Sequence, residues 1–238
     1  MLHQTQASEP SAGGGISDRA AAIGLLLPVL LMAGATAATT TDGSAGPIAL
    51  TNAELLGGLL VELLLTATVG VWLWRSGWRP HRDATRAFEP QDVTRGLGLW
   101  VAAILSVMGW ALVCRLLWPG LLTISEQTQI IGTPHVLVSV AFSIYNALFE
   151  ELLWLALGIA AFRRFGLATA ATVSVALRLL AHAYQGPLAL VTILPIGIVF
   201  TIYYLRNRRL WPIVVAHAFQ DILALTMLGA RSQESGAV

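Results

Sequence analysis

The chain alternates between long apolar runs and short polar segments. Runs of roughly 20 residues suit helices that cross the hydrocarbon core of a bilayer, and they are too long and continuous for the strands of a membrane barrel. The apolar runs lie at residues 20–41, 55–74, 96–117, 134–162, 165–182, 188–205 and 210–228. We therefore predict an all-α fold class, a polytopic membrane helix bundle of about seven transmembrane helices.

The polar segments divide the chain into four parts. Residues 1–18 are rich in Gly, Ser, Gln and Ala, which predicts a disordered N-terminal tail. Residues 19–133 carry three predicted transmembrane helices and a basic loop at 75–95, residues 134–228 carry the other four, and residues 229–238 form a short C-terminal tail. The first run, with the AGATA after it, also fits a secretory signal peptide. Its weak and late charged region favours an uncleaved first helix.

Composition excludes a soluble globular protein. Hydrophobic residues make up 56% of the chain and charged residues only 11%, and the mean hydropathy is +0.71. Soluble domains have about a quarter of their residues charged, so this chain cannot cover a surface that faces water. We predict that the protein lies in the lipid bilayer and binds no nucleic acid. The single cysteine, Cys114, has no second cysteine with which to form an intramolecular disulfide.

The distribution of arginine predicts the orientation. All 14 basic residues are Arg, and eleven of them fall on one side of the predicted spans. These are Arg19, Arg75, Arg79, Arg82, Arg86, Arg95, Arg163, Arg164, Arg206, Arg208 and Arg209. Because basic loops remain in the cytoplasm, we predict a multi-pass protein with a cytoplasmic N-terminus, in which the loop 75–95 is cytoplasmic.

Six ionisable residues lie well inside the later apolar runs. They are Glu150, Glu151, Arg178, His182, His217 and Asp221. An ionised side chain at mid-bilayer costs roughly 2.5–3.5 kcal/mol on insertion scales, so such residues face a bundle interior or a wet cavity and usually serve a function. Their concentration in three predicted helices indicates one shared cavity.

Helical spacing groups these residues further. His217 and Asp221 are four residues apart and share a helix face, as do Arg178 and His182. Asn146 shares a face with Glu150, and Glu151 is turned by about 100° from its neighbour. At 1.5 Å per residue, His217 lies about 10 Å and His182 about 25 Å from the basic side, so one cavity requires tilted or offset helices.

The order and spacing of these motifs resemble a known family. The three elements read EELLWL at 150–155, RLLAH at 178–182 and HAFQD at 217–221. This pattern is similar to that of the CAAX prenyl endopeptidase and bacteriocin-processing family (CPBP, or Abi) of membrane proteases. The resemblance covers about residues 134–228, a CPBP-like catalytic core, while residues 1–133 match only as generic spans. The flanking sequences AHAYQGP and RRLWPIVVAHAFQD resemble bacterial members, which implies the plasma membrane of a bacterium.

The resemblance implies an intramembrane endopeptidase and gives each residue an expected role. Glu150 is the general base that activates water, and His182 assists it. His217 and Asp221 stabilise the oxyanion, and Glu151 completes the catalytic set. A carboxylate in an apolar cavity gains basicity, and an imidazole N–H can donate to a developing negative charge.

The resemblance also implies the substrate class. The expected substrate is a peptide or protein in the membrane, either a membrane-tethered tail or a leader peptide. We expect its cleavage at or near the cytoplasmic half of the membrane.

The sequence departs from the family pattern at three positions. Leu155 stands where the family has Arg, and Arg178 stands where it has Phe. We hypothesise that the cation that balances the two glutamates has moved to Arg178, a supporting role that Asn146 shares. Asp221 stands where some relatives have Asn, and an ionised Asp accepts hydrogen bonds but does not donate them. We therefore expect it to orient His217.

The sequence leaves alternatives open for both the cofactor and the function. Members of the family are often called metalloproteases, and two Glu with two His suit a divalent metal such as Zn. The sequence lacks HExxH, so the cofactor stays open. The alternatives to a protease are a catalytically silent membrane scaffold or binding relative and a proton- or ion-coupled transporter. Glu62 and Arg115, in earlier spans, are assigned a structural role as a pair.

Overall fold

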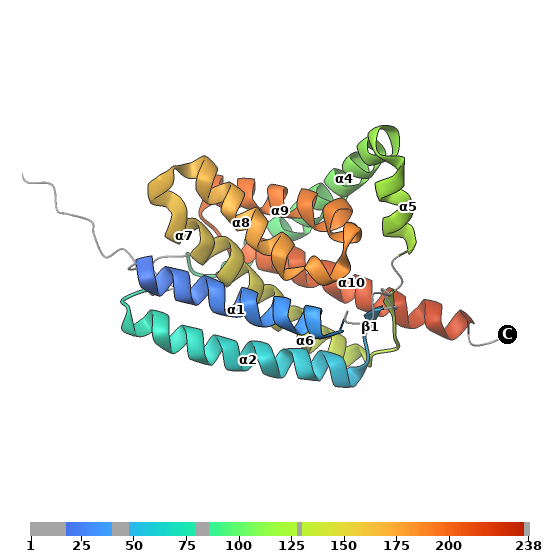
Figure 1. Cartoon of the computed structure of the whole chain (residues 1–238), viewed down its shortest axis with the longest axis horizontal. Helices are drawn as coiled ribbons and strands as arrows, with labels where there is room; N and C mark the ends of the chain where they lie inside the picture. The colour runs from blue at the N-terminus through green and yellow to red at the C-terminus, as the bar shows by residue number, and fades with distance from the viewer. Residues whose placement is uncertain (1–17, 40–47, 80–85, 128–129, 236–238) are drawn as a thin grey trace, which may run out of the picture.

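The computed structural model describes residues 18–39, 48–79, 86–127 and 130–235. Residues 1–17 of the predicted disordered tail, and residues 80–85 of the basic loop, lie outside the described residues. Within the described part, the chain forms a bundle of helices that run roughly along one long axis (Figure 1). The helices are α1 (Asp18–Thr39), α2 (Asn52–Arg75), α4 (Gln91–Leu117), α5 (Pro119–Gln127), α6 (Val136–Glu150), α7 (Gly158–Phe162), α8 (Leu167–Ala181), α9 (Pro187–Asn207) and α10 (Trp211–Ser235).

Each predicted apolar run coincides with helical structure, so the all-α class is confirmed. Four helical segments are long and apolar enough to cross a membrane, namely Asn52–Arg75, Gln91–Leu117, Val136–Phe165 and Pro187–Asn207. Shorter apolar helices lie at Ala21–Leu31, Leu167–Ala181 and Trp211–Met227. Helix α5 was not predicted, and it follows α4 after the single residue Trp118. The protein is a membrane protein. By length and composition four helical segments of the described part can cross a membrane, so the count of seven spans stays a prediction.

The long helices turn large apolar side chains outward. Leu60 and Leu64 on α2 are 57% and 60% exposed, and Leu105 and Leu116 on α4 are 61% and 72% exposed. A soluble monomer rarely exposes apolar surface on this scale. Lipid tails are the medium that such helix faces suit.

The interior of the bundle forms around α6 and α10. Helix α10 packs against α4 and α6, α8 packs against α7 and α9, and α1 lies against α2 and α8. Trp154, Leu155 and Ile213 are fully buried in this core. The packing brings residues from both halves of the chain to one central volume.

A short β pairing closes one end of the bundle. Strand β1 (Ile48–Ala49) pairs in parallel with β2 (Ile130–Ile131), which ties the start of α2 to the start of α6. Gly132 follows β2 with φ +149°, and a Cβ there would lie 2.2 Å from the Leu50 carbonyl oxygen. Only glycine tolerates both this backbone and this close approach.

An ion-pair network joins the N-terminal end of α4 to the C-terminal end of α9. Arg209 precedes α10, and its Nε and Nη2 donate to the two carboxylate oxygens of buried Asp92 at 2.9 and 2.8 Å. Arg209 Nη1 also donates to Glu89 at 2.9 Å. This hydrogen bond lowers the pKa of Glu89 from its ordinary value. The bidentate geometry fixes the loop between α9 and α10 against the start of α4.

Helices α4 and α10 approach each other closely at Gly96, which yields a first prediction. A Cβ at Gly96 would lie 2.6 Å from Val215 Cβ and 2.8 Å from the Pro212 carbonyl oxygen. Gly96→Ala should therefore force the helices apart and lower the free energy of unfolding by about 1–3 kcal/mol. Denaturation of the purified protein in detergent measures the change.

The matched control for this prediction lies two residues away. A Cβ at Gly98 would meet nothing within 4 Å, so Gly98→Ala should leave stability unchanged or raise it by up to about 1 kcal/mol. Equal effects of the two substitutions would contradict the packing of α4 on α10.

Candidate active site

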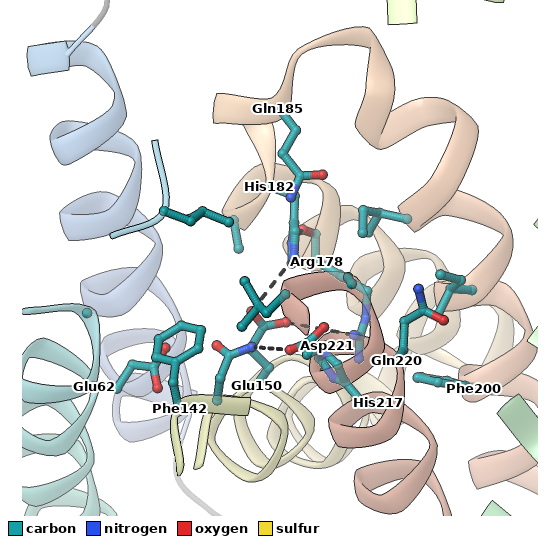
Figure 2. A pocket seen from close by; sticks show the side chains of 18 of the residues that line it. Glu62, Phe142, Glu150, Arg178, His182, Gln185, Phe200, His217, Gln220 and Asp221 are labelled. Atoms are coloured by element: carbon teal, nitrogen blue, oxygen red, sulfur yellow. Dashed lines mark hydrogen bonds and ion pairs between the residues drawn. The ribbon is translucent and has the colours of Figure 1, made fainter. Parts of the chain in front are cut away.

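A cavity of about 360 Å³ lies inside the bundle, lined by residues of α2, α4, α6, α8, α9 and α10. Six of the seven predicted site residues line it, from segments far apart in the sequence (Figure 2). They are Asn146, Glu150, Arg178, His182, His217 and Asp221. The seventh, Glu151, lies behind the wall, fully buried. Five of the six ionisable residues therefore share one cavity with Asn146, and Glu151 does not line it.

The two adjacent glutamates are separated by a change in helix type. Helix α6 ends at Glu150, and a π-helical segment, η1 (Glu151–Leu157), continues directly to α7. A π-helix is wider than an α-helix and occurs mostly at functional sites. Glu150 and Glu151 are both buried, at 3% and 0% exposure. The uniform α-helix assumed from the sequence does not describe how this segment places its two carboxylates.

Both oxygens of Glu151 are engaged. Arg178 Nη2 donates to Oε2 at 2.5 Å, and His217 Nδ1 donates to Oε1 at 2.6 Å. Charge-assisted hydrogen bonds of this length are strong, and they satisfy a carboxylate that would be costly to bury alone. Glu151 therefore fixes the positions of two side chains that do line the cavity.

Arg178 lies against both glutamates, as the hypothesis of a relocated cation requires. Its Nη1 is 3.8 Å from Glu150 Oε2, in addition to the contact with Glu151. The side chain passes Gly197 of α9, where a Cβ would lie 3.2 Å from Arg178 Cδ. Leu155, which replaces the family arginine, is fully buried among apolar side chains. The positive charge beside the glutamates thus comes from α8.

Glu150 faces the cavity and is less tightly held than Glu151. Its Oε2 has no hydrogen-bond partner among the described residues, and its Oε1 lies 3.8 Å from His182 Nε2. His182 caps the C-terminus of α8, and its Nδ1 donates to the Arg178 carbonyl oxygen at 2.9 Å. Because that carbonyl can only accept, Nδ1 carries a proton, and Nε2 is the nitrogen turned toward Glu150.

His217 lies between two carboxylates. Its Nδ1 contacts Glu151, and its Nε2 lies 3.5 Å from Asp221 Oδ2. Asn146 Nδ2 donates to the same Asp221 oxygen at 3.0 Å. A ring with a carboxylate at each nitrogen can donate from both. Asp221 is therefore placed to orient His217, in agreement with the expectation from its residue type.

The two histidines line the same cavity. The count from the basic side separated His182 and His217 by about 15 Å along the helix axes. In the structure His182 follows the end of the short helix α8, whereas His217 lies early in α10, and each lies near one of two adjacent glutamates. Both histidines therefore reach one cavity despite their different positions along the two helices.

The cavity extends toward the end of the bundle that lacks the basic segments. Leu50, Leu55 and Gln185 line it, and they lie where α2 begins and where α8 ends. The basic ends of α2 and α9, at Arg75 and Arg206, lie at the other end of the bundle (Figure 1). With the predicted orientation, this arrangement differs from the expected cleavage in the cytoplasmic half.

Sequence reasoning missed several residues of the cavity. Glu62 of α2 lines it, buried at 7% exposure, and does not pair with Arg115, which is exposed on α4. Phe142 and Gln220 also line it, and Trp100 Nε1 donates to Gln220 Oε1 at 2.7 Å. The signal for Glu62 was present, since it is an acidic residue inside an apolar run. Phe142 and Gln220 carry no comparable signal.

The donor set does not fit a divalent metal. Among the described residues, no group of three or more His, Cys, Asp and Glu side chains converges as metal ligands do. Arg178 and His217 bind both oxygens of Glu151. This carboxylate is therefore already paired with the Arg178 cation and is not free to act as a metal ligand. A metal that used Glu151 as a ligand would have to displace this guanidinium.

Comparison with known proteins agrees with the resemblance noted in the sequence. Residues 132–223 match the family described as Type II CAAX prenyl endopeptidase Rce1-like. The matched segment runs from the end of β2 to the middle of α10 and includes every predicted site residue. Searches of curated proteins and of solved structures found no match. Over residues 132–223, which are less than half of the chain, the protein is therefore similar to the Rce1-like family of CAAX-protease-type membrane endopeptidases.

Proposed function

We propose that the protein is an intramembrane endopeptidase in which Glu150 activates a water molecule for attack on a peptide bond. The observation that carries this proposal is the difference between the two glutamates. Glu151 is fully engaged behind the cavity wall, whereas Glu150 lines the cavity. Its Oε1 lies 3.8 Å from His182 Nε2, and its Oε2 has no hydrogen-bond partner among the described residues. A general base must be able to accept a proton, and Glu150 has that capacity.

The proposed attack uses Glu150 and His182 together. Their closest atoms are 3.8 Å apart, too far for a direct hydrogen bond, and a water beside them can donate one proton to each. The water oxygen then points a lone pair into the cavity. Glu150 takes a proton as the oxygen bonds to the peptide carbonyl carbon. The same proton then passes to the amide nitrogen as the C–N bond breaks, which leaves a carboxylic acid and an amine.

His217 is proposed to stabilise the oxyanion. Glu151 holds its Nδ1, which aims its Nε2 along the cavity wall near Asp221. An N–H donor held in place before the reaction stabilises developing charge without reorganisation. Asp221 and Asn146 act as positioning residues for this donor, since Asn146 donates to Asp221. In this scheme Glu151 and Arg178 support the geometry and take no part in proton transfer.

The finer topology and substrate are part of the same proposal. We propose that the three shorter apolar helices also lie in the membrane, which makes seven spans, in the plasma membrane of a bacterium with the N-terminus in the cytoplasm. The substrate is a membrane-tethered protein tail or a leader peptide. The position of the cavity supports cleavage between mid-membrane and the end of the bundle without basic loops. The Arg178 contacts also weigh against a catalytically silent relative, because the missing family arginine is compensated.

The test is hydrolysis of a diverse peptide library by protein purified in mild detergent, with products identified by mass spectrometry. We expect discrete cleavage of internal peptide bonds that proceeds equally in the presence of a chelator. The absence of cleavage by folded wild-type protein, in detergent and in vesicles, would refute the protease and favour the binding or transport alternatives.

A further inference from the structure

Glu62 is a buried carboxyl group that forms no ion pair within the part of the chain that the structure describes. It lies on α2, is only 7% exposed, and faces the cavity (Figure 2). Its Oε2 has no hydrogen-bond partner among the described residues. A carboxylate in an apolar setting needs a proton or a cation nearby. The proposed hydrolysis gives Glu62 no role.

The carboxyl groups around the cavity outnumber the cationic side chains near them. Four carboxyl groups surround it in the described structure, those of Glu62, Glu150, Glu151 and Asp221. The cations available to them are Arg178 and, when protonated, His182 and His217, so four carboxyls face at most three cations. Each of the other three carboxyls lies within 4 Å of at least one of these groups, but Glu62 does not.

An aromatic ring lines the same cavity as this carboxyl. Gly58 is four residues before Glu62 and shares its face of α2. A Cβ at Gly58 would lie 3.2 Å from Phe142 Cε2, so the glycine lets the ring pack closely against the helix. Phe142 and Glu62 both line the cavity, and Figure 2 shows them at the same edge of it, with His217 and Gln220 at the other. A carboxylate next to an aromatic face is a combination that recognises cationic groups.

We propose that Glu62 and Phe142 form a subsite for a basic side chain, Lys or Arg, of the peptide substrate. The apolar stem of such a side chain packs on Phe142, and its charged end pairs with Glu62. The subsite rests on the proposed endopeptidase function and adds a specificity to it. Because Glu62 and Glu150 line the same cavity from α2 and α6, the basic residue lies a few positions from the cleaved bond.

The test compares matched peptides that differ only by Lys or norleucine at one position. For each of three positions on either side of the cleaved bond, kcat/KM is measured with the wild type and with Glu62→Gln. At one position we expect the wild type to prefer Lys by about 10- to 100-fold, because a buried hydrogen-bonded charge pair contributes that much. In Glu62→Gln this ratio should fall close to one. Phe142→Leu should reduce the Lys-to-norleucine ratio several-fold. This second variant tests the subsite if Glu62→Gln fails to fold.

A control and a binding assay separate the possible failures. Glu54→Gln alters an exposed glutamate of the same helix, where Gln can keep the capping box with Thr51, and it should keep the wild-type ratio. Binding of labelled forms of the same peptides is also measured. The two proteins compared are the Glu150→Gln variant and the double variant that also carries Glu62→Gln. If the wild type cleaves nothing, the proposed function fails, yet Lys-dependent binding that requires Glu62 would still support the subsite. Equal treatment of Lys and norleucine at every position in both assays, or a preference that survives Glu62→Gln, would overturn it.

Discussion

Glu150→Gln is expected to lower kcat/KM for peptide hydrolysis by about 10²- to 10⁴-fold, the usual contribution of a general base. Gln has nearly the volume of Glu but cannot accept the proton of the attacking water. The pocket geometry should survive the change, because Oε2 of Glu150 makes no hydrogen bond in the described structure and the nearest charged atoms are 3.8 Å away. Steady-state kinetics on a cleaved library peptide measure the loss.

Stability distinguishes this loss from misfolding. A nearly unpartnered buried carboxylate opposes folding, so Glu150→Gln should unfold at the same temperature as the wild type or higher. Glu54→Gln, an exposed change of the same type on α2, should leave both activity and stability unaltered. Wild-type turnover by folded Glu150→Gln would disprove the role of Glu150 as the base.

Arg178→Met is expected to produce the largest loss of stability, about 3–5 kcal/mol, because it leaves Glu151 buried with an uncompensated charge. Met retains much of the side-chain volume beside Gly197, so the effect reports on charge and not on a cavity. Activity should fall with it, since His217 depends on the same carboxylate for its position. Equilibrium unfolding in detergent measures the first effect and peptide hydrolysis the second.

A double variant and a surface variant serve as controls. In Arg178→Met with Glu151→Gln the uncompensated charge is absent, so part of the lost stability should return. Arg206→Met removes an exposed arginine at the end of α9 and should change stability by less than about 0.5 kcal/mol. If Arg178→Met were as harmless as Arg206→Met, the idea that Arg178 replaces the family arginine would be wrong.

Adjacent glutamates have different surroundings because their side chains point in different directions. On a regular helix, neighbours are about 100° apart, and one of them would point away from any single cavity. At the junction of α6 with η1, one carboxylate faces the cavity while the next is enclosed by Arg178 and His217. One glutamate is thereby left accessible to substrate, and the other holds its neighbours in place.

The sequence by itself determined the membrane setting, the helical class and most of the ionisable residues that line the cavity. These followed from local properties, because burial in lipid requires apolar runs of a certain length and makes each intramembrane charge conspicuous. Glu150, Arg178, His182, His217 and Asp221 were identified in this way. Even the relocation of the balancing cation was predictable, because a missing Arg and an extra Arg stood in the same motif set.

Only the tertiary structure decided which of these residues contact one another and which face the cavity. Which glutamate lines the cavity, and which one binds Arg178 and His217, depends on how α6 and η1 pack against α10 and α8, and this packing has no local sequence signal. Glu62 joined the site because α2 packs on α6, a contact between segments some eighty residues apart. Long-range packing is a property of the whole bundle, since each helix must bury its polar face against whichever helices satisfy it.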